Sequence, residues 1–359
     1  MTDDSQLVFE VKKTDWKQTR FVEGPVPELA PGQVLFRLDR FALTANNITY
    51  AVAGDGIGYW RFFPCDEGWG RIPVMGFADV IRSTHPGVEV GTRCFGFYPM
   101  GRHLVIQPGT VSPGQIVDAA PHREGLAPVY AQYLPTTGDA VYSKKREDAI
   151  LLMRGLFMTS FLADDALSES AYGGARSVLI SSASSKTSIA LAFQIKQAGH
   201  VRAIGLTSAR NAEFVRKLGF YDQVVEYDRV GSLPVEPAAF VDMAGDGPVN
   251  AALHRHFGDE LKVDLRIGAT HWSAERSNER LPGPKPTPFF APGQIVKRTK
   301  EWGAQGLSER IAGAWTKFCD ASDAWLHVER HLGRDALEHV YQETLAGRTR
   351  PADGHVVSL

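Results

Sequence analysis

The residues best suited to bind an anion form a short polar run after an apolar segment. The run at 182–188 reads Ser-Ala-Ser-Ser-Lys-Thr-Ser, and it follows Ser-Val-Leu-Ile-Ser at 177–181. Hydroxyl and ammonium groups both bind phosphate, and backbone N–H groups are free where a helix begins. We predict a phosphate cradle made of four of these residues: Ser184, Ser185, Lys186 and Thr187. The alternative is an ordinary polar turn in which a serine caps the following helix.

The elements around this run have the layout of a unit that binds dinucleotides. Strands are predicted at 177–181, 202–206, 223–226, 238–242 and 263–267. Helices are predicted between them at 189–198, 210–218 and 248–257. Strands that alternate with such helices form a parallel, doubly wound sheet, in which the first helix N-terminus meets a pyrophosphate. The usual glycines are absent from the turn, so the layout supports the fold more strongly than the ligand.

The end of the second predicted strand indicates which dinucleotide would bind. Thr207, Ser208 and Arg210 follow this strand, and no acidic residue occurs before Glu213. An acidic side chain here binds the ribose 2′-hydroxyl of NAD, whereas a guanidinium suits the 2′-phosphate of NADP. We therefore expect NADP(H). The alternative is that Arg210 and Asn211 simply begin a surface helix.

Small residues follow the fourth and fifth predicted strands. They are Ala244, Gly245 and Ala269, and each leaves room for a nicotinamide ribose at the edge where open α/β sheets bind ligands. His271 lies at the same edge as a candidate proton relay. The alternative is that these are ordinary strand ends, where glycine is common.

Residues 1–145 have a different character, rich in glycine, proline and short alternating runs. Strands are expected at 34–42, 74–83 and 91–98, and turns at Pro86-Gly87 and Pro108-Gly109. This pattern is typical of a β-barrel-like domain. Further along the chain we expect a charged connector or helix start at 144–148, a helix at 149–166, a proline-rich loop at 282–288, a helix at about 305–326 and a strand at 354–359.

Composition narrows the class of protein. With 359 residues, 43% of them hydrophobic, the chain suits two globular domains. A net charge of −2 gives no electrostatic case for nucleic acid or an anionic membrane. Three scattered cysteines fit a reducing compartment, and no apolar run approaches the ~18 residues of a membrane span. We expect a soluble, cytoplasmic protein with a small-molecule substrate.

Five segments together resemble the medium-chain dehydrogenase/reductase superfamily. Pro-Gly-Gln-Val-Leu-Phe-Arg at 31–37 is similar to an early family motif, and Val-Gly-Thr-Arg-Cys-Phe-Gly at 90–96 to a later one. Met-Thr-Ser-Phe-Leu at 158–162, the segment 219–227 and the C-terminal segment 345–359 also match in order and spacing. The chain most resembles the zinc-free, quinone oxidoreductase-like and enoyl reductase-like members, as a divergent branch.

This resemblance implies an α/β fold class with two domains. A GroES-like catalytic domain at 1–145 would be completed by about 305–359, and a Rossmann dinucleotide-binding domain would occupy 146–304. The family's glycine turn falls on Ser185–Ser188, and Tyr227 falls where some NADPH-dependent relatives present a tyrosine to the 2′-phosphate. Relatives imply a homo-oligomer, a dimer or a tetramer.

The resemblance also implies that no metal takes part. The family's catalytic zinc ligands are replaced near Ala45 and at Gly76-Phe-Ala78, and no cysteine cluster occurs. Zinc-free relatives instead place an asparagine and a tyrosine after the early strand. The candidates here are Asn46, Asn47, Tyr50 and Tyr59, which would hold a substrate oxygen. The alternative is a polar turn with an Asx cap and a core tyrosine.

The implied function is an NADPH-dependent, zinc-independent reductase. It would reduce an activated double bond or carbonyl in a small apolar substrate of the quinone, enone or enoyl type. Aromatic residues expected to line an apolar pocket are Trp60, Phe62, Phe63, Trp69, Phe289 and Phe290. One alternative is a non-catalytic or ligand-binding descendant that has lost its cofactor, and another is an enzyme of this fold that uses NADP(H) for a different reaction.

Overall fold

The computed structural model describes residues 5–56, 58–267 and 281–359 of the chain. The chain divides into two compact units: unit 1 is Met1–Leu152 with Leu326–Leu359, and unit 2 is Met153–Trp325. Unit 1 is built on a nine-stranded sheet and unit 2 on a six-stranded sheet, within the described residues. The expected fold class is therefore confirmed.

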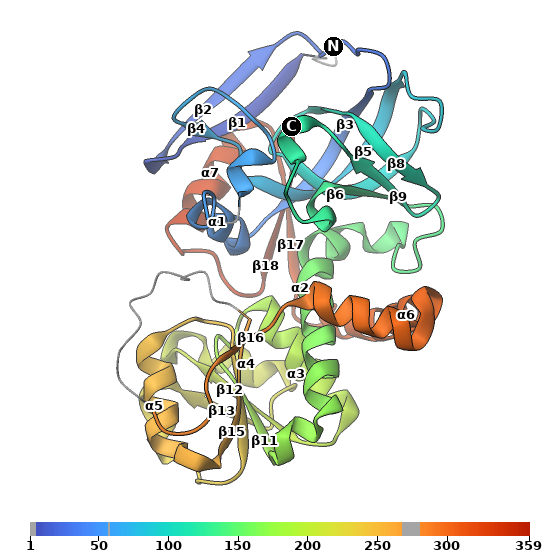
Figure 1. Ribbon diagram of the computed structural model, residues 1–359. Coiled ribbons are helices and arrows are strands. Elements are labelled where there is room, and N and C mark those ends of the chain that lie inside the picture. The colour runs from blue at the N-terminus through green and yellow to red at the C-terminus, as the bar shows by residue number, and fades with distance from the viewer. Residues whose placement is uncertain (1–4, 57, 268–280) are drawn as a thin grey trace. The chain divides into compact units, whose positions relative to one another are not determined.

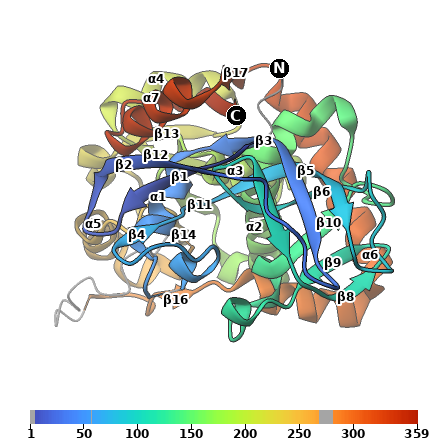
Figure 2. The same cartoon turned by 90° about the horizontal axis from the view of Figure 1, so that it is seen from above.

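Unit 1 holds the β-rich part of the chain. A small antiparallel sheet has the order β2-β1-β4, with β1 at Gln6–Lys12, β2 at Asp15–Gly24 and β4 at Trp69–Gly70. The large sheet has the order β17-β18-β3-β5-β6-β10-β9-β8, and β7 also pairs with β3. Figure 2 shows β3, β5, β6 and β10 side by side. The bounds are β3 Val34–Leu43, β5 Pro73–Ser83, β6 Arg93–Pro99, β7 His103–Ile106, β8 Pro108–Ser112, β9 Gln115–Asp118, β10 Gln132–Pro135, β17 His327–Leu332 and β18 Asp353–Ser358.

The C-terminal segment completes unit 1. Strand β18 lies between β17 and β3, and helix α7 (Arg334–Leu345) packs against β2 (Figure 1). The ring of Tyr341 on α7 lies 5.1 Å from that of Phe9, and its hydroxyl donates to the Trp16 carbonyl at 2.9 Å. Both aromatic rings are fully buried, so residues more than 300 positions apart share one core.

Unit 2 is a parallel sheet with the strand order β13-β12-β11-β14-β15-β16. In chain order this is 3-2-1-4-5-6, the order of dinucleotide-binding folds, and the order reverses between β11 and β14. The strands are β11 Ser177–Ile180, β12 Arg202–Thr207, β13 Gln223–Glu226, β14 Ala238–Asp242, β15 Leu261–Arg266 and β16 Thr287–Pro288. The helices are α3 Lys186–Ala198, α4 Ala209–Leu218, α5 Gly247–Phe257 and α6 Ala291–Ser322.

Helix α6 corrects one expected boundary. It begins at 291 rather than at about 305, changes direction at Gly303 (φ 74°), and belongs to unit 2 instead of completing the first domain. The reason is an aromatic contact: Phe318 of α6 lies 5.2 Å from Phe157 of α2 (Glu147–Glu169) and 5.4 Å from Phe193 of α3. The return of the chain to unit 1 comes at Leu326.

Other local expectations also change. Pro108 and Gly109 begin β8 instead of forming a turn, and the charged run at 144–146 forms a 3-10 helix that leads into α2. The strands that were not expected from the sequence are β1, β2, β4, β7, β9, β10, β16 and β17. None of the helices in the described part of the chain is long and apolar enough to span a bilayer.

Candidate functional site

The turn between β11 and α3 carries the predicted cradle. Helix α3 begins at Lys186, three residues earlier than predicted, so Lys186 and Thr187 lie in its first turn. Ser185 is the N-cap: its hydroxyl accepts the Ser188 N–H at 3.2 Å and donates to the Ser188 hydroxyl at 2.9 Å. Ser188 in turn donates to the carbonyl of Ser181 at 2.9 Å. The capping alternative is therefore correct for Ser185.

The start of α3 also carries groups of the kinds that bind anions. The first N–H groups of a helix have no acceptor inside it, and the positive end of the helix dipole lies there. Ser184, Lys186 and Thr187 are partly exposed at this point. Together they offer a positive, hydrogen-bonding surface at the start of α3, where a glycine turn would offer bare backbone.

The first turn of α4 lies beside this surface. The Asn211 side-chain amide donates to the Ser184 hydroxyl at 3.0 Å. Arg210 is exposed at the position before Asn211, Ser208 is the N-cap residue of α4, and Thr207 is buried at the end of β12. The basic residue expected for a 2′-phosphate is thus accessible, whereas the Thr207 side chain is not.

Tyr227 supports the turn from the start of a 3-10 helix, Tyr227–Ser232, that follows β13. Its hydroxyl accepts the N–H of Ser182, at 2.9 Å, and Ser182 has a left-handed backbone with φ 50°. Burial raises the pKa of the Tyr227 phenol. The structure thus gives Tyr227 a contact with the β11–α3 turn itself.

A buried hydrogen-bond network joins the ends of β11 and β14. The Ser181 hydroxyl donates to the Asp242 carboxylate at 2.9 Å and accepts the Met243 N–H at 2.8 Å. Asp242 also accepts the N–H groups of Ala244 and Gly245, at 3.1 and 2.9 Å. Burial raises the pKa of Asp242, although these donors oppose the shift. This network, which the sequence did not reveal, fixes the loop that carries the predicted small residues. Ala269 and His271 lie outside the described residues.

In unit 1 the structure brings three of the four predicted donors together. The Asn46 amide on α1 (Ala45–Val52) donates to the Tyr50 hydroxyl at 2.7 Å. The Tyr50 ring lies 4.5 Å from that of Tyr59, whose hydroxyl is 3.3 Å from the Tyr130 hydroxyl. Tyr130 was missed because it lies 71 positions away in sequence.

Asn47 has a different role. Its side-chain oxygen accepts the Thr44 N–H at 2.7 Å, and its amide donates to the Pro73 carbonyl at 2.9 Å. It is buried and holds the start of α1 against β5, as in the Asx-cap alternative. Both ends of its amide are in use, so it is not accessible to a substrate.

Burial governs the protonation of the tyrosine cluster. It raises the pKa of Tyr50 and of Tyr59 far above the usual value, and the neighbouring phenols add to the shift. Both groups therefore stay protonated at neutral pH. Because the Tyr50 oxygen already accepts a bond from Asn46, its proton remains available for donation.

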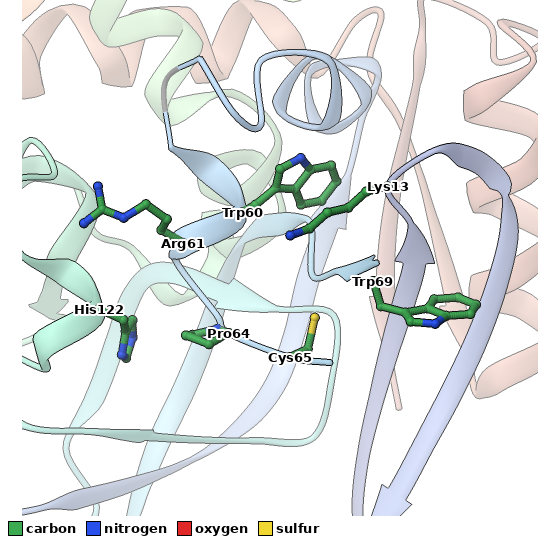
Figure 3. A pocket seen from close by; sticks show the side chains of 7 residues that line it. All are labelled: Lys13, Trp60, Arg61, Pro64, Cys65, Trp69 and His122. Atoms are coloured by element: carbon green, nitrogen blue, oxygen red, sulfur yellow. The ribbon is translucent and has the colours of Figure 1, made fainter. Parts of the chain in front are cut away.

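The expected apolar pocket is only partly present. Phe62 and Phe63 lie in the core around Tyr59, while Phe289 and the exposed Phe290 belong to unit 2. Trp60 and Trp69 line a cavity of about 220 Å³ (Figure 3). The other residues that line it are Lys13, Arg61, Pro64, Cys65 and His122. The Lys13 ammonium lies 5.8 Å from the Trp60 ring centre, so this cavity is charged as well as aromatic.

A cluster of possible metal ligands lies elsewhere in unit 1. Glu329, His331 and His355 place one ligand atom each within 4.8 Å of one another. No metal site was expected from the sequence, because Glu329 and His355 become neighbours only when β17 pairs with β18.

One family of proteins matches most of the chain. The family model described as "Protein of unknown function (DUF2855)" matches residues 41–350. The chain belongs to this family. None of the curated proteins matches the DUF2855 chain.

Solved structures share the fold of the DUF2855 chain across almost its whole length. A quinone oxidoreductase from Coxiella burnetii is 16% identical with a TM-score of 0.54, covering 99% of each chain. CurA from Vibrio vulnificus, in complex with NADPH, is 13% identical with a TM-score of 0.59, covering 95% of this chain and 94% of its own. A mutant enoyl thioester reductase from Candida tropicalis is 12% identical with a TM-score of 0.54, covering 99% of this chain and 100% of its own. The predicted resemblance is thus confirmed at the level of fold.

Proposed function

We propose that the DUF2855 chain is an NADPH-dependent, zinc-independent reductase of an activated double bond or carbonyl in a small apolar molecule. One observation carries the proposal: the strand-order reversal of unit 2 coincides with a turn that presents a helix start, a lysine and several hydroxyls. Open α/β sheets bind their ligands at this place. The likeness to CurA in complex with NADPH and to quinone and enoyl thioester reductases supports it.

The residues of unit 2 fit a dinucleotide with a 2′-phosphate. The start of α3, with Lys186 and Ser184, would hold the pyrophosphate by charge and hydrogen bonds. Arg210 would pair with the 2′-phosphate, since a planar guanidinium binds phosphate oxygens in pairs. Ala244 and Gly245 would leave room for the nicotinamide ribose. When bound, NADPH would supply a hydride.

The residues of unit 1 fit the polarisation of a carbonyl without metal. The Tyr50 phenol keeps its proton at neutral pH and would donate it in a hydrogen bond to the substrate oxygen. Asn46 is a positioning residue, because its amide fixes the Tyr50 hydroxyl. The rings of Tyr59, Phe62 and Phe97 surround this donor with apolar surface.

A second function is favoured by one observation. The hydroxyls of Ser184 and Ser185 already have partners within the chain, Asn211 and Ser188. A turn whose polar groups satisfy one another is also what a non-catalytic descendant would retain. This alternative predicts a stable fold that binds no dinucleotide.

Fluorescence titration with NADPH separates the two functions. Seven tryptophans provide the signal. The reductase proposal predicts saturable binding below millimolar NADPH, and oxidation of NADPH with at least one member of a quinone and enone panel. Absence of binding at millimolar NADPH would favour the non-catalytic descendant.

The choice of NADP(H) is tested by Arg210→Ala. Removal of the guanidinium should weaken the binding of NADPH by about tenfold or more. The affinity for NADH should stay almost unchanged, because only NADPH carries the 2′-phosphate. Arg216→Ala, an exposed arginine on the same helix 3.6 Å from Glu226, is the matched control. Equal losses for both coenzymes would remove the NADP assignment.

A further inference from the structure

The C-terminal strand pair of unit 1 places two histidines and a glutamate on one face. Strands β17 and β18 run parallel and side by side (Figure 1). Their register pairs Glu329 with His355. His331 lies two residues beyond Glu329 on the same strand, and residues two apart in a strand share a face. The fold therefore fixes three potential metal ligands next to one another, independently of any cofactor.

The separations of the ligand atoms match a coordination shell. His331 Nε2 lies 3.0 Å from His355 Nδ1, His355 Nδ1 lies 3.4 Å from Glu329 Oε2, and His331 Nε2 lies 3.9 Å from the same oxygen. Ligands held at the usual zinc distances in a tetrahedron are about 3.4 Å apart. The three edges lie around that value. The shortest is a hydrogen bond between the two imidazoles, which a bound ion would replace with the loss of its proton.

The surroundings allow an ion to enter and to be held. The side chains of His355, His331 and Glu329 are 11%, 20% and 43% exposed, which gives a half-buried site with an open side. The Arg350 guanidinium contacts one carboxylate oxygen of the glutamate: its Nη2 is 3.7 Å from Glu329 Oε1. The other oxygen, Oε2, is the one that faces the two imidazoles.

We propose that Glu329, His331 and His355 form a zinc site that links β17 to β18. Two imidazoles and one carboxylate are a known ligand set for Zn²⁺, with water in the remaining position. The ion would join two strands that are separated in the chain by α7, and so tie the C-terminal segment into the sheet. This site lies on strands of the sheet and does not include the tyrosine cluster. The zinc proposal is therefore independent of the proposed reductase function.

Metal binding by the full chain tests the site. Purified protein, stripped with chelator, is titrated with Zn²⁺ by calorimetry, and its thermal unfolding is followed with and without the metal. We expect one equivalent to bind and the Tm to rise, because an ion that binds only the folded state stabilises it. His331→Gln and Glu329→Gln should each weaken zinc binding by about tenfold or more and reduce the rise in Tm at equal zinc concentration.

His327→Ala is the matched control. His327 lies on the same strand and is exposed, and it is not one of the three clustered residues. This variant should bind zinc as the wild type does. Circular dichroism shows whether the two glutamine variants are folded, and these polar substitutions at partly exposed positions avoid a core defect. The proposal is wrong if the wild type binds no zinc, or if both folded glutamine variants bind it with unchanged affinity.

Discussion

At the scale of single residues, the protonation of a phenol decides what Tyr50 can do. Burial and the neighbouring tyrosines hold its pKa far above neutral pH, and the Asn46 amide occupies its oxygen. A phenol in this state is a hydrogen-bond donor and not a general base. Its proposed role is therefore to stabilise negative charge on a substrate oxygen.

Tyr50→Phe tests that role. Loss of one such donor should lower kcat by roughly 10²-fold on the best substrate of a quinone and enone panel, with NADPH affinity unchanged. Tyr98→Phe is the control, since Tyr98 is a buried tyrosine of unit 1 whose hydroxyl donates to the Cys94 backbone carbonyl at 3.2 Å. Similar kinetic losses in both variants would show that the effect on Tyr50 is structural.

Candidate residues were easier to choose from the sequence than the contacts that their side chains make. The run around Lys186 and the donors near Tyr50 were chosen as candidates because their chemistry is visible in the residue type. The roles of Ser185 and Asn47 as caps depend on side-chain direction, and the partnership of Tyr59 with Tyr130 depends on a contact between distant segments. Neither a direction nor such a contact is written in a local pattern.

At the scale of elements, helix α2 carries a half-buried acid, Asp164, with a clear consequence for stability. The Tyr172 hydroxyl donates to Asp164 at 2.7 Å. Burial raises the pKa of Asp164 to about 6, and nearby Asp165 adds to the shift. The folded state therefore favours the protonated acid, and its contribution to stability is present below the ordinary pKa and is lost as the pH rises to about 6.

Asp164→Asn makes this dependence measurable. Between pH 4 and pH 7, the free energy of unfolding of the wild type should fall relative to the variant by about 2 kcal/mol. Urea denaturation at both pH values gives the comparison. If the two proteins keep a constant difference across this range, Asp164 does not titrate as the structure indicates.

Element boundaries show why local patterns were only partly sufficient. Strands β11 to β15 of unit 2 were predicted well because each is a short apolar run between helices, whereas the exposed β16 falls in the expected proline-rich loop. The start of α3 was placed three residues late, since Lys-Thr-Ser has no helical periodicity and its helical state depends on the Ser185 cap. The membership of α6 depends on Phe318 meeting Phe157 and Phe193, which no local pattern shows.

At the scale of the whole molecule, unit 1 is assembled from both ends of the chain. Strand β18 lies between β17 and β3, with Val356 and Val357 buried. A Cβ on Gly354 would lie 2.4 Å from the Leu152 side chain, so the strand packs closely on the start of α2. The large sheet is therefore incomplete without the last residues.

Deletion of residues 353–359 tests this dependence. We expect unit 1 to lose its protease resistance, because β17 loses its neighbour and buried valines leave the core. Limited proteolysis with mass spectrometry should then yield a resistant fragment near Met153–Trp325. A digestion pattern identical to that of the full chain would contradict the assignment of β18 to the core of unit 1.

The most direct test of the account concerns the glycine-free turn. The central claim is that Lys186 and neighbouring hydroxyls bind the pyrophosphate of NADPH at the start of α3. Lys186→Ala should weaken the binding of NADPH by about tenfold or more, because a charged contact to phosphate is lost. Lys196→Ala in the last turn of the same helix, where the ammonium donates to the Gly219 carbonyl, should leave the affinity unchanged. Equal NADPH affinity in wild type and both variants would contradict the claim.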